Sequence, residues 1–450
     1  MTKKKKKKKI NMMSESAFLV LLLLLVTPTP TLAAMTAQGD DTSWLEFGGN
    51  RRHTGESSVA GPRHACTVLS WTRVPVTSDT NPIVDGEQTV YFGQWGQETS
   101  FYAWSTNASA PSSRQLWNDS HAELGVVAGS TPLLDEDSGR LFVITDSLGK
   151  GFFCLDAHTG KQVWPHYLPT ADSTCAPTFS RDKQLVYVGD WMANFYAVRA
   201  GTGELAWNFT DLTPPTAMPF NFNAAPVVHP NGTLVYAASL HKLYAFDSAT
   251  GAIRWNLCTN RWTNMTMPSL ALIFDEANNA LVFSALSNYL TVRDTPLGLR
   301  KLWNQALYSI DASTGAVRWQ ALAKPESASK AAIALCTHLD IVLYGSDSLQ
   351  ESSEHWLVAV AATDGTPRWR VPLAAPITSI VIDAVDTVYV TYGSVLSAFD
   401  AASGGKLWTW THSTVFVNML AITSSGTLWL SDDNEQFGVG ADGTPCVDHQ

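Results

Sequence analysis

Few stretches of the chain carry residue types and spacings that chemistry uses. Gly438-Val-Gly-Ala-Asp-Gly443 matches the glycine pattern of dinucleotide-binding loops and Gly201-Thr-Gly-Glu-Leu-Ala206 matches its variant, but neither opens a helix and both coincide with recurring turns. Asp135-Glu-Asp-Ser-Gly139 starts like a calcium loop but lacks the ligating glutamate at the twelfth position. The eleven histidines are scattered, and neither HExxH nor GxSxG occurs. The sequence therefore predicts no catalytic residue, no metal centre and no bound cofactor.

The elements that must position any site come from one repeated unit. Residues 243–255 read Leu-Tyr-Ala-Phe-Asp-Ser-Ala-Thr-Gly-Ala-Ile-Arg-Trp, an apolar strand, a polar turn ending in glycine, and a strand that closes on tryptophan. Residues 153–164, 308–319 and 397–408 repeat the unit, while 196–207 and 358–369 keep the glycine and tryptophan without the aspartate. Glycine supplies the positive φ that such turns need, and aspartate accepts hydrogen bonds from nearby backbone N–H groups.

The tryptophans of these units recur at a period that indicates a propeller or solenoid. Their spacing lies between 39 and 50 residues except for one interval of 64, for which we predict an insertion within residues 286–304. We expect each ring to pack against the neighbouring copy, because burial of a large ring dominates local packing energy. The docking positions are Trp71, Trp117, Trp164, Trp207, Trp255, Trp319, Trp369 and Trp408.

The two ends of the repeat region complete each other. The segment containing Trp71 has the docking tryptophan without the glycine turn, whereas residues 436–443 have the turn without a tryptophan. An N-terminal strand that completes the last sheet closes the ring and removes exposed edges. β-branched and aromatic residues alternate in short runs bounded by Gly, Asp and Asn, and no long helical period occurs. We predict an all-β, eight-bladed β-propeller, with seven blades as the alternative.

The first 33 residues are predicted to be a secretory signal peptide, followed by a single propeller domain over residues 34–450. Seven lysines precede a ten-residue apolar run, and small residues end the segment. Ten apolar residues are too few to span a bilayer, and an uncleaved anchor is the alternative. Removal of seven lysines and Glu15 changes the net charge from −10 to −16, which argues against nucleic acid and anionic membranes as partners. We expect a monomer in the secretory pathway or outside the cell.

Cysteines and glycosylation sequons fit an oxidising compartment. The six cysteines form no CxxC pair, and we single out Cys66 with Cys446 as a disulfide because both lie at the expected seam of the ring. The other four are disulfides or buried thiols. The candidate glycosylation sites are Asn107, Asn118, Asn208, Asn231 and Asn264.

A candidate binding rim follows from the topology. In a propeller, the loops between second and third strands share one end of the ring with the loops that link blades. Tryptophans with acidic neighbours at those positions would suit a peptide, a sugar or a basic partner. The alternative is that the rings fold back onto adjacent loops. The rim residues are Trp95, Asp146, Asp190, Trp191, His241, Asp347 and Asp432.

The repeat unit Leu-Tyr-Ala-x-Asp-x-x-Thr-Gly-x-x-x-Trp resembles that of the pyrroloquinoline-quinone (PQQ)-like repeat family. These β-propellers are related to quinoprotein alcohol dehydrogenases and to bacterial outer-membrane assembly propellers. The resemblance covers nearly all of residues 44–443, and the segment from Trp44 to Gly55 is similar to the opening of such propellers. It implies the fold, while the family holds both enzymes and non-enzymes. Its enzymes clamp PQQ with calcium beside a vicinal cysteine pair, and this chain has no adjacent cysteines.

Three functional hypotheses follow. The leading one is a secreted, non-catalytic scaffold that binds a protein or carbohydrate through its loop face. The alternative is a PQQ-dependent dehydrogenase with calcium. A third, a hydrolase or lyase, requires Asp190, His241 and Asp347 to converge at the channel mouth.

Overall fold

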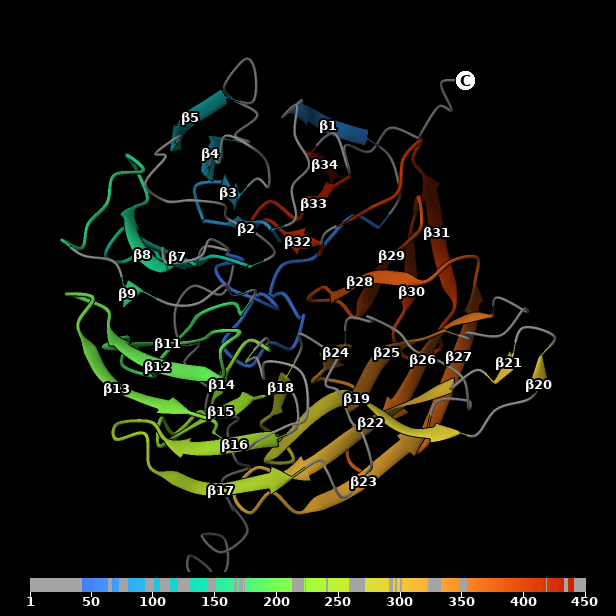
Figure 1. The fold of residues 1–450 in the computed structure, drawn as a ribbon. Helices are drawn as coiled ribbons and strands as arrows, with labels where there is room; N and C mark the ends of the chain where they lie inside the picture. The colour runs from blue at the N-terminus through green and yellow to red at the C-terminus, as the bar shows by residue number, and fades with distance from the viewer. Residues whose placement is uncertain are drawn as a thin grey trace, which may run out of the picture. The chain divides into compact units, whose positions relative to one another are not determined.

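Eight four-stranded antiparallel sheets form the blades of a β-propeller (Figure 1), so the ring has eight blades and not seven. In this computed structural model, residues Thr42–Gln450 form one compact unit. Met1–Asp41 form a separate unit, which contains the expected signal peptide and lies outside the described residues. The structure describes residues 43–63, 67–72, 80–93, 101–105, 114–119, 130–144, 151–165, 168–169, 173, 175–212, 222, 224–239, 242–258, 272–290, 294–295, 298–299, 302–322, 333–347, 354–417, 419–432 and 436–440.

The first four blades take their strands consecutively from the chain, from the innermost strand to the outermost. Blade 1 holds β2 (Ile83–Val84), β3 (Thr89–Gly93), β4 (Phe101–Ser105) and β5 (Arg114–Asp119), and blade 2 holds β6 (Leu133–Asp135), β7 (Arg140–Ile144), β8 (Gly151–Asp156) and β9 (Leu168–Pro169). Blade 3 holds β10 (Thr178–Phe179), β11 (Leu185–Gly189), β12 (Asn194–Arg199) and β13 (Leu205–Thr210), and blade 4 holds β14 (Val227–Val228), β15 (Leu234–Ala238), β16 (Lys242–Asp247) and β17 (Ile253–Cys258).

The last four blades differ from this order in two places, an insertion in blade 5 and the closure of blade 8. Blade 5 holds β18 (Leu272–Asp275), β19 (Ala280–Leu290), β22 (Leu302–Asp311) and β23 (Val317–Leu322), and blade 6 holds β24 (Ile333–Cys336), β25 (Ile341–Asp347), β26 (His355–Ala361) and β27 (Pro367–Leu373). Blade 7 holds β28 (Ile377–Ile382), β29 (Thr387–Tyr392), β30 (Val395–Asp400) and β31 (Lys406–Thr411), and blade 8 holds β32 (Ala421–Ile422), β33 (Leu428–Ser431), β34 (Gln436–Gly440) and β1 (Thr67–Thr72).

Ring closure and the insertion both lie where the sequence predicts them. Strand β1 pairs with β34, with Trp71 opposite Phe437, so the N-terminal strand completes the last sheet. In blade 5, β19 and β22 have 11 and 10 residues and pair from Ala280–Asp311 out to Leu290–Leu302. A small hairpin of β20 (Asp294–Thr295) and β21 (Gly298–Leu299) follows (Figure 1).

The apolar core lies between neighbouring blades. One buried cluster joins Tyr236 and Leu243 of blade 4 to Phe283 and Tyr308 of blade 5. Central strands such as β15 are buried along most of their length because both faces are covered by adjacent blades, whereas outer strands such as β27 alternate between exposed and half-buried residues. Among the described residues, no helix is long and apolar enough to cross a membrane.

Tryptophan and glycine hold adjacent blades together at the repeat turns of blades 2 to 7. The indole N–H of Trp164 donates to the carbonyl of Ala200 in the next blade (3.0 Å), and Gly203 of that blade lies against the ring. In the corresponding turn of blade 4, the carboxylate of Asp247 accepts hydrogen bonds from the backbone N–H and the hydroxyl of Thr250. The same indole-to-carbonyl bond, 2.7–3.1 Å long, joins Trp117 to Ala157, Trp207 to Ser248, Trp255 to Ala312, Trp319 to Ala362 and Trp369 to Ala401. Trp408 instead donates to the carbonyl of Pro62, in the segment that precedes β1. The side chain of Trp71 lies outside the described residues.

Candidate functional site

Asp190, expected on the binding rim, is fully buried and holds its own loop together. It follows β11, and its carboxylate accepts hydrogen bonds from the backbone N–H groups of Met192 and Asn194, both 2.9 Å long. The hydroxyl of Tyr196 donates to the other carboxylate oxygen (2.9 Å). The burial, together with the carboxylate of Asp190, raises the pKa of Tyr196. Asp190 therefore stabilises the β11–β12 loop from the protein interior and does not face a ligand.

Asp432 is also internal. Its side chain is 2% exposed, and it accepts hydrogen bonds from Nε2 of His412 (2.9 Å) and from the hydroxyl of Thr414. Asp347 ends strand β25 opposite His355, and its side chain lies outside the described residues. The other rim residues, Trp95, Asp146 and His241, lie outside the described residues as well. The acidic character predicted for the rim is thus absent at the two carboxylates whose side chains the structure describes.

Trp191 belongs to a small apolar patch at the loop end of blade 3. Its ring is half-buried, and its indole N–H has no hydrogen-bond partner among the described residues. The next residue, Met192, is 58% exposed, and Leu212, which follows β13, is 84% exposed. The backbone N–H of Asp211 donates to the carbonyl of Ala193 (2.9 Å), which brings the two loops side by side. We call Trp191, Met192 and Leu212 the blade-3 apolar patch.

Buried carboxylates fix both halves of this patch. Asp190 stabilises the first half, where Ala193 adopts a left-handed backbone with φ of 64°. Asp211 fixes the second half, because its carboxylate accepts hydrogen bonds from the hydroxyls of Tyr244 (2.6 Å) and Ser239 (3.3 Å) in blade 4. A loop whose backbone is already fixed by buried contacts loses less conformational entropy on binding, which favours recognition through its exposed apolar side chains. The sequence singles out Trp191 and Asp190, but nothing in it indicates that Leu212 would join them.

The segment from Trp44 to Ser57 crosses the centre of the ring, which the sequence did not predict (Figure 1, dark blue). It hydrogen-bonds in turn to the inner strands of several blades, so it acts as a built-in plug on the channel. Backbone bonds of 2.7–3.0 Å join Trp44 to Val84, Leu45 to Leu134, Arg52 to Phe274, Thr54 to Leu335 and Ser57 to Ile382. Inside the plug, His53 is 1% exposed and lies edge-on to Phe47.

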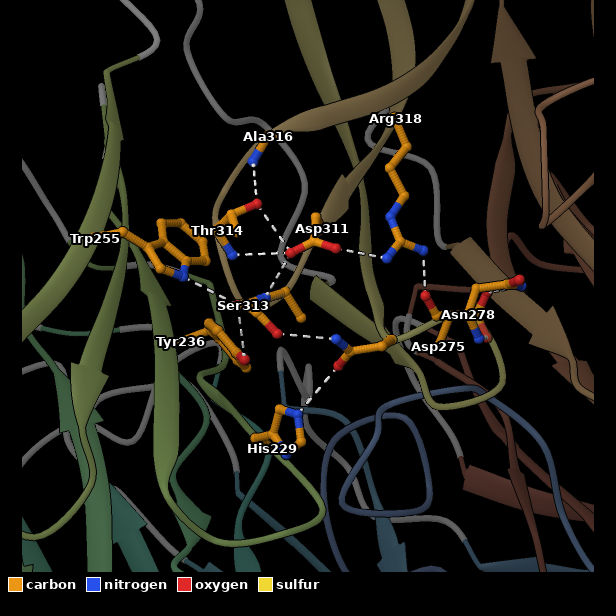
Figure 2. A network of polar contacts seen from close by, with 12 residues as sticks. His229, Tyr236, Trp255, Asp275, Asn278, Asp311, Ser313, Thr314, Ala316 and Arg318 are labelled. Atoms are coloured by element: carbon orange, nitrogen blue, oxygen red, sulfur yellow. Dashed lines mark hydrogen bonds and ion pairs between the residues drawn. The ribbon is translucent and has the colours of Figure 1, made fainter.

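The turns between first and second strands also make contacts between neighbouring blades, at the opposite ends of the blades from the blade-3 apolar patch. Every turn between a first and a second strand has one residue with φ between 46° and 77°, and several of these residues contact the preceding blade. Asn279 bonds to His229 of blade 4 and to Ser313 of its own blade, and these two partners are labelled in Figure 2. Asp386 bonds to His338 of blade 6. The eight positions are Gln88, Gly139, Lys183, Gly232, Asn279, Asp340, Asp386 and Gly426.

The described residues bring together no donor set for a metal ion. No three His, Cys, Asp or Glu side chains among them form a group that could hold one. Cys154, Cys175 and Cys336 are buried free thiols in three different blades. Burial raises the pKa of each of these thiols to about 12, so they are inert at neutral pH. The side chain of Cys258, together with Cys66 and Cys446, lies outside the described residues.

Three of the five sequon asparagines are exposed. Asn118 and Asn208 follow the docking tryptophans on β5 and β13, and Asn231 lies in the β14–β15 turn, where its side-chain oxygen accepts hydrogen bonds from Thr233. Asn107 and Asn264 lie outside the described residues.

Comparison with known sequences identifies one family. The family model described as outer membrane protein assembly factor BamB matches residues 106–310 and 304–439. An uncharacterized protein of Rickettsia conorii is 28% identical over 155 residues, which cover 32% of this chain and 36% of that protein. The match thus spans about a third of the length of this curated relative.

Three solved structures that superpose on this chain show the fold alone, because each is 15% identical or less. A quinohemoprotein alcohol dehydrogenase from Comamonas testosteroni superposes with a TM-score of 0.68 at 13% identity, covering 91% of this chain and 82% of the other. BamB from Moraxella catarrhalis gives 0.58 at 15% identity (83% and 99% covered), and the computationally designed Ika8 protein gives 0.60 at 11% (85% and 99% covered). An oxidoreductase, an assembly factor and a designed protein share this ring, so function must be argued from the site.

Proposed function

Because the chain belongs to the family described as outer membrane protein assembly factor BamB, we propose that it is a secreted, non-catalytic scaffold that binds a partner protein through its loop face. The observation that carries the proposal is the blade-3 apolar patch, where two large apolar side chains are more than half exposed beside a half-buried tryptophan. Apolar anchors of this kind dominate the energy of protein interfaces. Met192 and Leu212 favour an apolar protein surface over a carbohydrate, which offers mainly hydroxyls.

We expect the double substitution Met192→Ser and Leu212→Ser to weaken partner binding about tenfold or more, because anchor residues typically contribute about 1–2 kcal/mol each. Affinity capture from the secretory compartment, quantified by mass spectrometry, would identify the partner, and titration of the purified pair would give the change in Kd. Leu407→Ser is the matched control, because Leu407 is 54% exposed on the outer strand of blade 7. An unchanged Kd for the double variant would contradict the proposal.

The competing hypothesis, a PQQ-dependent dehydrogenase, predicts a different result. We expect calorimetric titration of the protein with PQQ and calcium to show no saturable binding, since the described residues offer no cluster of metal-ligating side chains. Stoichiometric, tight binding would replace the scaffold with the dehydrogenase.

Sequencing the N-terminus of the secreted protein tests the leader, which we expect to be removed after residue 33.

A further inference from the structure

A cavity of about 330 Å³ lies between blades 2 and 3, at the other end of strand β11 from the apolar patch. Three turns line it, those of β6–β7, β10–β11 and β12–β13. Its volume is at the lower end of the range for small-molecule sites. The cavity is lined by Asp135, Asp137, Ser138, Arg140, Phe142, Asp182, Lys183, Gln184, Ala200 and Gly201.

Most charges around this cavity are already paired. Lys183, one of the left-handed turn residues, donates to Asp135 (2.5 Å) and to Asp137 (2.6 Å) of the preceding blade. Asp135 also accepts a hydrogen bond from the hydroxyl of Ser138. These three charged groups join blades 2 and 3, so they are unavailable to a ligand without loss of that contact.

Two charged groups on the lining, Arg140 and Asp182, form no ion pair within 4 Å among the described residues, although Arg51 lies near enough to Asp182 to help lower its pKa. Arg140 is half-buried, and its guanidinium makes one hydrogen bond, 3.3 Å long, to the carbonyl of Ala200. No carboxylate among the described residues forms an ion pair with it. In Asp182, one carboxylate oxygen accepts from the hydroxyl of Ser180 (2.7 Å) and the backbone of Gln184 (3.1 Å), while the other has no partner among the described residues. The hydrogen bond from Ser180 lowers the pKa of Asp182, so this carboxylate is charged at neutral pH.

Arg140 and Asp182 thus carry opposite charges on one cavity without meeting each other. A ligand that carries both a carboxylate and an ammonium group would satisfy both at once. Guanidinium binds carboxylate through two parallel N–H···O bonds, and ammonium pairs with carboxylate as a compact cation. Phe142, Ala200 and Gly201 supply the apolar part of the lining.

We propose that this cavity binds a small zwitterion, a free amino acid or a short peptide, with the ligand carboxylate on Arg140 and the ligand ammonium on Asp182. The site is separate from the apolar patch, so its test does not depend on the proposed function. Isothermal titration of the full mature chain with leucine and with the dipeptide leucyl-alanine distinguishes the two sources of the zwitterion. We expect at least one of them to bind with a Kd of about 1 mM or tighter, the affinity a ligand of this size can reach.

Blocked ligands test each half of the site without changing the protein. N-acetylleucine lacks the ammonium and leucinamide lacks the carboxylate, so each should bind at least about tenfold more weakly than leucine, the loss of one charged hydrogen-bonded contact. Equal binding of the blocked and unblocked ligands would overturn the proposal. The absence of saturable binding for both zwitterions would overturn it as well.

Variants locate the site. Arg140→Gln and Asp182→Asn should each weaken zwitterion binding about tenfold or more and abolish the difference between leucine and the corresponding blocked ligand. Arg254→Gln is the matched control, because Arg254 lies in blade 4 and pairs with Asp247 away from the cavity. Thermal melting shows that each variant is folded before titration. Binding unchanged in folded Arg140→Gln would place the ligand elsewhere and overturn the assignment.

Discussion

Gly203→Ala is expected to destabilise the protein by about 3 kcal/mol or more. Gly203 has φ of 78°, where an alanine costs roughly 1–2 kcal/mol. Its added Cβ would lie 2.7 Å from Cδ2 of Trp164, and overpacking of a buried site costs about 1–3 kcal/mol more. Trp164 cannot move away, because its ring is 2% exposed and its indole N–H is bonded to Ala200. The two costs arise together, since one glycine both reverses the turn and seats the neighbouring blade's tryptophan.

Gly201→Ala is the matched control in the same turn. The φ of Gly201 is not in the left-handed region, and its nearest non-adjacent atom, Nη1 of Arg140, is 3.8 Å from where a Cβ would lie. We expect a change within about 1 kcal/mol, in either direction. Urea denaturation of the two variants and the wild type measures the difference. Similar free energies of unfolding for Gly203→Ala and Gly201→Ala would show that the ring contact does not hold the blades together.

The spacing of Trp164 and Gly203 explains why the fold can be predicted from the sequence. Both residues act within one repeat period, so the pattern that specifies each turn also specifies which ring packs on it. The same reasoning finds the closing strand, because Trp71 and residues 436–443 each lack what the other has. The blade-5 extension follows from a single interval that is longer than the others.

The candidate site is less predictable, because its properties depend on contacts between loops that do not repeat. Sequence position places Asp190 on a loop, but only the structure shows that its carboxylate turns inward to Met192, Asn194 and Tyr196. Leu212 and Met192 come to the same end of blade 3 because one backbone bond, from Asp211 to Ala193, joins their two loops. The cavity beside Arg140 is built from three turns in two blades. One of its residues, Lys183, has a left-handed backbone, which a lysine in the sequence does not predict.

The central plug also shows a limit of sequence reasoning. Residues 44–57 read as turn-rich and irregular, yet their backbone groups bond to inner strands of several blades. Because residues of this segment bond to different blades in turn, the segment has no periodic sequence pattern. His53 is the clearest case, since a lone histidine is expected at the surface or as a satisfied core residue. His53 instead lies buried, with neither ring nitrogen in a hydrogen bond of normal geometry.

The second large expected effect is a loss of stability in acid that depends on His53. Burial lowers the pKa of His53 from 6.5 to about 3, and a contact with the Leu272 backbone offsets only part of that effect. Neither ring nitrogen makes a hydrogen bond of normal geometry. The unfolded chain binds a proton near pH 6.5 while the folded chain stays neutral, so the free energy of unfolding falls as pH drops below 6.5. The slope approaches 1.4 kcal/mol per pH unit, or roughly 2 kcal/mol between pH 6.5 and 4.5.

His53→Asn isolates this contribution. Asparagine tolerates the left-handed backbone at this position, φ of 56°, and does not titrate. A smaller side chain lowers stability by a constant amount, so the test compares slopes: urea denaturation from pH 7.5 to 4.5 should show a wild-type advantage that shrinks as pH falls. His338→Asn should give the opposite sign, because the exposed imidazole of His338 bonds to Asp386, which raises its pKa and adds stability in acid that is lost as pH rises. Parallel pH profiles for wild type and His53→Asn would contradict this prediction, because they would mean that His53 takes up its proton in the folded state. The buried imidazolium would then need a hydrogen-bond partner, and the described contacts provide none.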